Sequence, residues 1–195
     1  IGPVVAHGSY LVNLASPDPG LLERSRQAFL EELRRAQALG IPCVITHPGA
    51  HMGAGVAAGL ARIVESLDWL DERAGEGAPL VCLETTAGPG TVLAGDFGHL
   101  GAILGQVRTP ARLGVCLDTG HWRFGTGESP VDAVAEFGDR IWHVHFKDAD
   151  PAVMAESRRE EWDGITSTGH GVFCEPGKGC VDFPGVLAAL GDLGY

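Results

Sequence analysis

Short apolar runs alternate along the chain with longer amphipathic segments. The apolar runs cover residues 3–6, 42–46, 80–83, 113–117 and 141–146. Runs of this length and composition predict strands buried on both faces. The segments between and after them carry apolar residues near helical spacing and predict helices over residues 21–39, 57–73, 97–107, 130–137 and 183–193. The alternation predicts an α/β domain of about five βα units around a parallel sheet.

A polar segment, here called a tip, follows each apolar run. The tips read HGSY from residue 7, THPGAH from 46, ETTAG from 84, DTGH from 118 and HFKD from 145. In a parallel barrel the C-terminal ends of the strands share one face, so these tips are expected to converge on one pocket. Imidazoles and carboxylates are ligands of zinc, manganese and iron. The tips therefore predict a divalent-metal site on that face.

The net charge and the cysteines argue against two classes of protein, those with a long basic nucleic-acid surface and those built on disulfides. A formal net charge of -11 argues against a long basic surface that tracks a nucleic-acid backbone. Bound divalent cations would reverse the field locally, so a small nucleic-acid cleft remains compatible with this charge. The cysteines, 5 in number and without a C-x-x-C pair, predict buried thiols rather than a disulfide framework.

The chain shows neither a membrane-spanning run nor the layout of a signal peptide. No apolar run approaches the roughly 20 residues that a membrane-spanning helix needs. The N-terminus lacks a basic segment followed by an apolar one. We therefore expect a cytoplasmic protein with no membrane partner.

Several tips carry a resemblance to a known family. The segment HGSYLVNLASP, residues 7–17, resembles the first signature of the endonuclease IV family, and THPGAH, LETTAGPG and GVCLDTGH follow in the family's order and spacing to about residue 121. This resemblance implies a zinc-dependent hydrolase with up to three Zn²⁺ ions in a TIM-type barrel. Its expected activity is the cleavage of the phosphodiester 5′ to an abasic site in DNA, a step of base excision repair.

The same resemblance implies the residues of the metal site. The ligand set comprises His7, His47, Glu84, Asp118, His121 and His145. The first two histidines would share one zinc with Glu84, which would bridge to a second zinc held by Asp118 and His145. His121 would serve a third zinc. Glu84 is the candidate catalytic residue, with the role of orienting the metals rather than moving protons.

The resemblance also implies contacts with DNA, and the chain departs from the family in two motifs. Tyr10 and Leu11 match positions that enter DNA near the lesion, where aromatic and apolar side chains replace stacking. The family writes DTCH and HLND where this chain has DTGH and HFKD, so Gly120 and Lys147 are substitutions. The D-x-H pair that completes the third zinc in the family is not found after HFKD.

From about Asp118 onward the chain resembles another branch of the same superfamily. HVHFKDADP and the segment from residue 171 to 195 resemble inosose dehydratases and xylose-isomerase-like sugar enzymes. This resemblance implies a single divalent ion, Mn²⁺ or Co²⁺, held in this chain by Glu84, Asp118 and His145. Lys147 then stands where that branch expects it, as a substrate-binding residue for a small polyol or sugar.

Both families have two strands before the one that ends at His7 and a further strand after the position of Tyr195. We therefore expect residues 1–195 to form a single partial TIM-type barrel, incomplete at both ends, without the first two strands and the last. Its first and last strands would be exposed edges, so the isolated chain is expected to aggregate or to oligomerise through them.

Three functions follow as hypotheses. The leading one is metal-dependent cleavage of abasic DNA. The alternative is a single-metal sugar isomerase or epimerase or an inosose dehydratase. The third is an inactive or chimeric barrel fragment that keeps the metal-binding tips without turnover.

Overall fold

The main sheet has five parallel strands in the order β1-β2-β3-β4-β5. The computed structural model describes residues 4–88 and 90–195. The strands are β1 (Ala6–His7), β2 (Cys43–Thr46), β3 (Leu80–Glu84), β4 (Leu113–Asp118) and β5 (Ile141–His145). Strands that follow one another in the chain are neighbours in the sheet, as in the wall of a barrel and unlike a doubly wound sheet.

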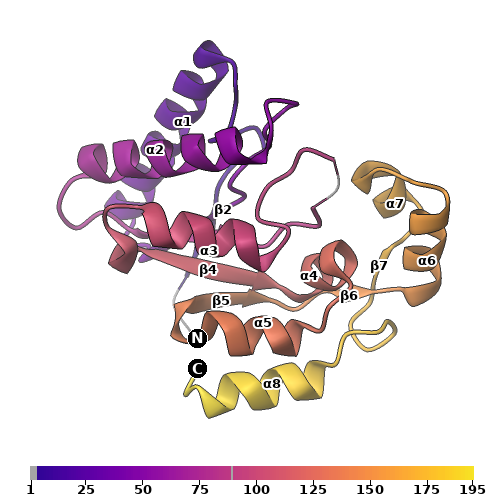
Figure 1. Cartoon of the computed structure of the whole chain (residues 1–195). Helices are drawn as coiled ribbons and strands as arrows, with labels where there is room; N and C mark the ends of the chain where they lie inside the picture. The colour runs from indigo at the N-terminus through magenta and orange to yellow at the C-terminus, as the bar shows by residue number, and fades with distance from the viewer. Residues whose placement is uncertain (1–3, 89) are drawn as a thin grey trace.

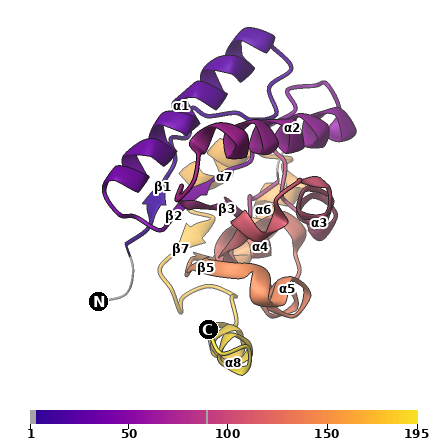
Figure 2. The same ribbon diagram turned by 90° about the vertical axis from the view of Figure 1, so that its left-hand side faces the viewer.

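Helices line the outside of the curved sheet, where α1 packs against α2, α2 against α3 and α5 against α8 (Figure 2). The helices are α1 (Pro19–Ala38), α2 (Val56–Ala74), α3 (Phe97–Gln106), α4 (Thr119–Thr126), α5 (Pro130–Phe137), α6 (Pro151–Arg159), α7 (Gly164–Gly169) and α8 (Phe183–Asp192), with 3₁₀ turns at Pro110–Arg112 and Gly138–Arg140. A small antiparallel pair, β6 (Asp148–Ala149) and β7 (Phe173–Cys174), lies beyond β5 (Figure 1). The prediction of a partial TIM-type α/β barrel of about five βα units is confirmed.

The strands bury both of their faces. Because side chains alternate along a strand, Val44 faces the helices while its neighbours Cys43 and Ile45 face the inside of the curved sheet. The inner cluster also contains Cys82 and Cys116, and the outer core includes large side chains of α1, α2 and α4. All the cysteines are free, and those of β2, β3 and β4 are buried, as the sequence predicted.

The predicted bounds of the first strand are wrong. Residues 3–6 were expected to form it, but β1 consists of Ala6 and His7, which pair with Val44 and Ile45 of β2. Pro3 lies outside the described residues. His7 is therefore a strand residue at the edge of the sheet rather than a residue of the following loop.

The apolar periodicity of the sequence does not predict α4, α6, α7 or the β6–β7 pair. Helix α4 begins directly at the end of β4, where the Asp118 side chain accepts a hydrogen bond from the backbone N–H of His121 at 2.8 Å. Helix α6 begins after Asp150, which caps it, with Pro151 in its first turn. Both starts carry a cap residue visible in the sequence, but the helices are too short for a clear apolar period.

The sheet is open. In the described part of the chain β1 pairs with β2 alone and β5 with β4 alone, so each end of the sheet presents an edge (Figure 1). None of the described helices is long and apolar enough to cross a membrane.

Candidate metal centre

The C-terminal ends of the five main-sheet strands bring the predicted ligands together at one rim. His7, Glu84, Asp118 and His145 are the last residues of β1, β3, β4 and β5. His47 follows β2 directly, and His121 lies in the first turn of α4. The convergence follows from the parallel topology, since residues that end successive parallel strands share one face of the sheet.

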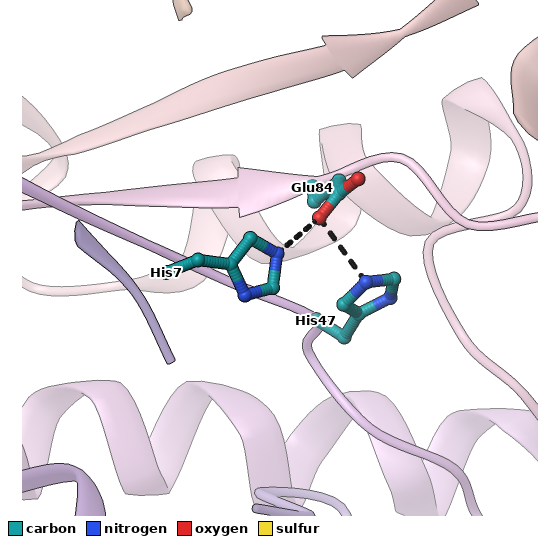
Figure 3. A group of neighbouring side chains, drawn as sticks. All are labelled: His7, His47 and Glu84. Carbon is teal, nitrogen blue, oxygen red and sulfur yellow. Dashed lines mark hydrogen bonds and ion pairs between the residues drawn. The ribbon is translucent and has the colours of Figure 1, made fainter. Parts of the chain in front are cut away.

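Glu84 lies at the centre of this group. Its side chain is 3% exposed, and its Oε2 atom lies 2.7 Å from His7 Nε2 and 3.1 Å from His47 Nε2 (Figure 3). Ligand atoms that share one zinc lie roughly 3.3 Å apart, because Zn–N and Zn–O bonds are about 2.0–2.2 Å long. His7, His47 and Glu84 therefore have the spacing of three ligands of one ion.

These three residues are called the first group. The other carboxylate oxygen of Glu84 faces a second group, which consists of Asp118, His121 and His145. Glu84 Oε1 lies 2.9 Å from His145 Nδ1 and 3.7 Å from His121 Nδ1. Asp118 Oδ2 lies 3.4 Å from His121 Nδ1 and 3.9 Å from His145 Nδ1. The Lys147 ammonium also enters this group, at 2.8 Å from Asp118 Oδ2. Glu84 thus has the geometry of a bridge, with one oxygen toward each group.

The electrostatics of the cluster favour ionised carboxylates. Burial acts to raise the pKa of Glu84, but its contacts with three imidazoles, first that of His145, outweigh burial and hold the pKa well below its usual range. The hydrogen bond to Glu84 raises the pKa of His7 against the effect of burial. Burial lowers the pKa of His121. Metal ligands bind in their deprotonated forms, so the lowered pKa of Glu84 favours coordination by this carboxylate.

Two buried polar atoms of the cluster have charged neighbours but no hydrogen bond. Among the described residues, His47 Nε2 lies 3.1 Å from Glu84 Oε2 and Asp118 Oδ2 lies 2.8 Å from Lys147 Nζ, and neither atom has a contact of hydrogen-bond geometry. A buried polar atom without such a bond costs free energy unless a charge or a metal ion compensates it. One of these atoms belongs to each group, so the donor set fits a divalent cation in the first group, while the second already contains a lysine.

Of the two predicted DNA contacts, Tyr10 lies against the cluster, and Leu11 follows it in the chain. The Tyr10 ring stacks against His7 with a centroid distance of 5.4 Å and lies 5.2 Å from the ring of His47. Tyr10 is 81% exposed and Leu11 is 92% exposed. The two side chains therefore form an exposed aromatic and apolar rim, with Tyr10 in contact with the imidazoles.

Sequence reasoning missed the residues that hold the tips in place. Buried Thr85 donates to the Asp118 carbonyl and accepts from the Asp118 N–H, which joins the ends of β3 and β4. Buried Thr119 joins the ends of β4 and β5 in the same way, through the backbone of Lys147. A threonine directly after a strand-end carboxylate, as in ETT and DTG, was the available signal.

Asn13 joins the first two tips. Its amide donates to the Ala50 carbonyl and accepts from the backbone N–H groups of Ala15 and Ala50. A side chain at Gly49 would collide with it, because a Cβ there would lie 2.3 Å from Asn13 Oδ1. This bridge fixes the loop of Tyr10 against the loop of His47.

Asp163 and His170 do not belong to either group of predicted metal ligands, and both have structural contacts elsewhere. Asp163 caps α7 by accepting from the Thr166 N–H, and His170 stacks on Trp162 with a centroid distance of 4.0 Å. Neither belongs to a group of metal-ligand spacing in the described part of the chain. They therefore do not replace the D-x-H pair absent from the sequence.

Comparison with known proteins places the chain in a family. A family model described as "Xylose isomerase-like TIM barrel" matches residues 2–195. A curated relative from Nitratidesulfovibrio vulgaris, "Probable endonuclease 4", is 44% identical over 126 residues, which cover 65% of this chain and 44% of that protein. The chain thus spans less than half the length of this relative.

Solved structures share the fold. Endonuclease IV from Thermus thermophilus matches with 29% identity and a TM-score of 0.61 over 75% of this chain and 53% of its own. A D-tagatose 3-epimerase-like protein matches with 22% identity and a TM-score of 0.80 over 99% of this chain and 67% of its own. The second likeness shows the fold alone.

Proposed function

The chain belongs to the xylose isomerase-like TIM barrel family, and from that premise we propose that it serves in metal-dependent cleavage of the DNA phosphodiester 5′ to an abasic site. Support comes from the similarity to proteins named probable endonuclease 4 and from the arrangement of the strand-end tips.

The observation that carries the proposal is the exposed Tyr10, whose ring stacks on His7 and lies beside the ring of His47. A large exposed aromatic beside an apolar side chain suits a partner that offers a flat ring and a gap in its stack. An abasic duplex has both. A small sugar would instead be enclosed in a concave pocket that buries most of its surface.

Each residue of the centre has a distinct part in this proposal. His7, His47 and Glu84 would hold the cation, which when bound supplies Lewis-acid polarisation of a phosphoryl oxygen and a water of lowered pKa. Glu84 holds its histidine partners in orientation through its two oxygens. Lys147 contributes a fixed positive charge beside Asp118, in a chain whose net charge of -11 otherwise repels DNA.

Nicking of a duplex that contains one abasic site tests the proposal. Glu84→Gln keeps the shape of the side chain but removes the charge that joins the two groups, so both zinc content and nicking should fall, the latter by at least about 100-fold. Glu175→Gln is the matched control, because Glu175 is an exposed glutamate paired with Lys178. Full nicking activity in the Glu84→Gln variant would contradict the assignment of the centre.

The ion pair of Lys147 with Asp118 favours a second candidate, a single-metal sugar isomerase or epimerase or an inosose dehydratase. An ammonium inside the second group leaves less room for further ions, and that branch uses one. Conversion of a ketose or an inosose in the presence of Mn²⁺ or Co²⁺, with no nicking of abasic DNA, would establish the second candidate and exclude the first. A chain with neither activity would fit the inactive or chimeric fragment.

A further inference from the structure

We infer that the Lys147 ammonium fills the second cation position of the centre, so that the chain binds one divalent ion, at His7, His47 and Glu84. This inference rests on the proposed function, since it concerns the same centre. Lys147 Nζ lies 2.8 Å from Asp118 Oδ2 and 2.8 Å from His121 Nε2. These are two of the residues that would otherwise hold a further ion.

The contacts of His121 leave neither ring nitrogen free for metal. Nδ1 lies 3.1 Å from the Thr85 carbonyl oxygen, which can only accept a hydrogen bond, so this nitrogen carries the proton. Nε2 is then the acceptor for the Lys147 ammonium. A metal ion needs a nitrogen lone pair, and the one that His121 offers is already engaged.

Both carboxylate oxygens of Asp118 also have partners within the chain. Oδ1 accepts from the His121 backbone N–H at 2.8 Å as the cap of α4. The charge on Oδ2 is met by Lys147. A second divalent ion at this position would have to displace the ammonium or lie beside it in a buried setting, where like charges repel strongly.

Gly120 makes room for this lysine. A Cβ at position 120 would lie 2.8 Å from Lys147 Cγ and 2.9 Å from Lys147 Cβ, closer than real Cβ contacts come. Gly120 and Lys147 are the two departures from the endonuclease motifs DTCH and HLND, and the structure places them in contact. The two substitutions are therefore coupled, because Gly120 has no side chain in the space that the lysine stem occupies.

By contrast, the first group stays open to an ion. Its atoms come from His7, His47 and the Oε2 atom of Glu84, with His47 Nε2 buried and without a hydrogen bond among the described residues. His7, His47 and Glu84 would hold the ion, whereas the ammonium lies against Asp118 and His121. The lysine thus replaces part of the charge that a second ion would bring to a bound phosphate.

Zinc stoichiometry tests the inference without reference to activity. The purified chain is loaded with Zn²⁺, desalted and measured by inductively coupled plasma mass spectrometry. Wild type should hold one zinc per chain. Lys147→Met keeps the stem but removes the charge, which frees Asp118 and His121, and should hold about two. Gly120→Cys should also move toward two, because the new side chain pushes Lys147 out of its position.

The controls separate this inference from the proposed function. Lys178→Met removes an exposed lysine that pairs with Glu175, so it should stay at one zinc. Two or more zinc ions on wild type, or one on both Lys147→Met and Gly120→Cys, would overturn the inference and leave the proposed function standing. A rise in the Lys178→Met control equal to that of Lys147→Met would overturn it too. A wild-type chain that takes up no zinc would contradict the proposed function itself.

Discussion

Glu84 shows how a single side chain sets the chemistry of the rim. A buried carboxylate is costly unless it is paired, and Glu84 has imidazoles of His7, His47 and His145 within 3.1 Å. The pairing keeps the carboxylate ionised, as its lowered pKa shows. The consequence is a negative charge fixed between two groups of nitrogen ligands, which is the arrangement that a cation site requires.

Tyr10 offers a direct test of the DNA hypothesis at the residue scale. Stacking of a base on an aromatic side chain contributes about 1–3 kcal/mol, so Tyr10→Ala should raise the KM for an abasic duplex by about 5- to 150-fold with little change in zinc content. Tyr195→Ala is the matched control, because Tyr195 is the other tyrosine and is also exposed. An unchanged KM in Tyr10→Ala would remove the observation on which the proposed function rests.

At the scale of elements, one buried side chain, that of Asp148, joins the last tip to the loop before α8, in addition to the pairing of β6 with β7. Asp148 of β6 is fully buried, and its carboxylate accepts hydrogen bonds from the backbone N–H groups of Ala149, Gly177, Gly179 and Val181 at 2.8–3.0 Å. Gly179 permits this approach, since a Cβ there would lie 2.3 Å from the carboxylate. The loop after β7 is thus folded around one acid.

Loss of this acid should destabilise the chain. Asp148→Ala leaves the four N–H donors without their acceptor and should lower the free energy of unfolding by about 3 kcal/mol in urea denaturation. Asp192→Ala, which removes an exposed acid of α8, should cost less than about 0.5 kcal/mol. Equal costs for the two variants would refute the role of Asp148 as an anchor.

The same acid predicts a pH dependence. Burial acts to raise the pKa of Asp148, but the backbone hydrogen bonds, first that of Val181, outweigh it and lower the pKa below its ordinary value of 3.8. A carboxyl with a lowered folded pKa stabilises the fold above its unfolded pKa, and this contribution is lost as the pH falls through the folded value. The stability difference between wild type and Asp148→Asn should therefore be constant near neutral pH and shrink below about pH 4.

At the scale of the molecule, the sheet is a barrel wall with two open edges. Strand β5 has five residues and a single neighbour, and the N–H and C=O groups along its other side lack strand partners in the described part of the chain. Exposed edges of this kind promote pairing between copies.

We therefore expect the isolated chain to self-associate. Sedimentation velocity over a range of concentrations should show a weight-average mass that rises above the 20.4 kDa of one chain. Dilution should reverse the association where it proceeds through strand edges. A single species of monomer mass with a cooperative thermal transition, at every concentration, would contradict this expectation.

The sequence by itself determined the βα alternation and most element positions. Helix α5 has the predicted bounds, and α1, α2, α3 and α8 differ from theirs by one or two residues, because long amphipathic segments with cap residues have a strong periodic signal. The order of the tips and the parallel topology then placed six potential ligands on one rim. Short elements such as α7 and β6 were not predicted, since they contain too few residues to show a periodic pattern of apolar positions.

Only the tertiary structure decided which of these residues meet. It put Lys147 between Asp118 and His121, brought Gly120 against the lysine stem, and left Leu11 exposed. These relations join different strand ends, and sequence spacing carries no information on the distance between side chains of different strands. The physical reason is that strand ends define a rim, whereas rotamers and buried hydrogen bonds across that rim define the site.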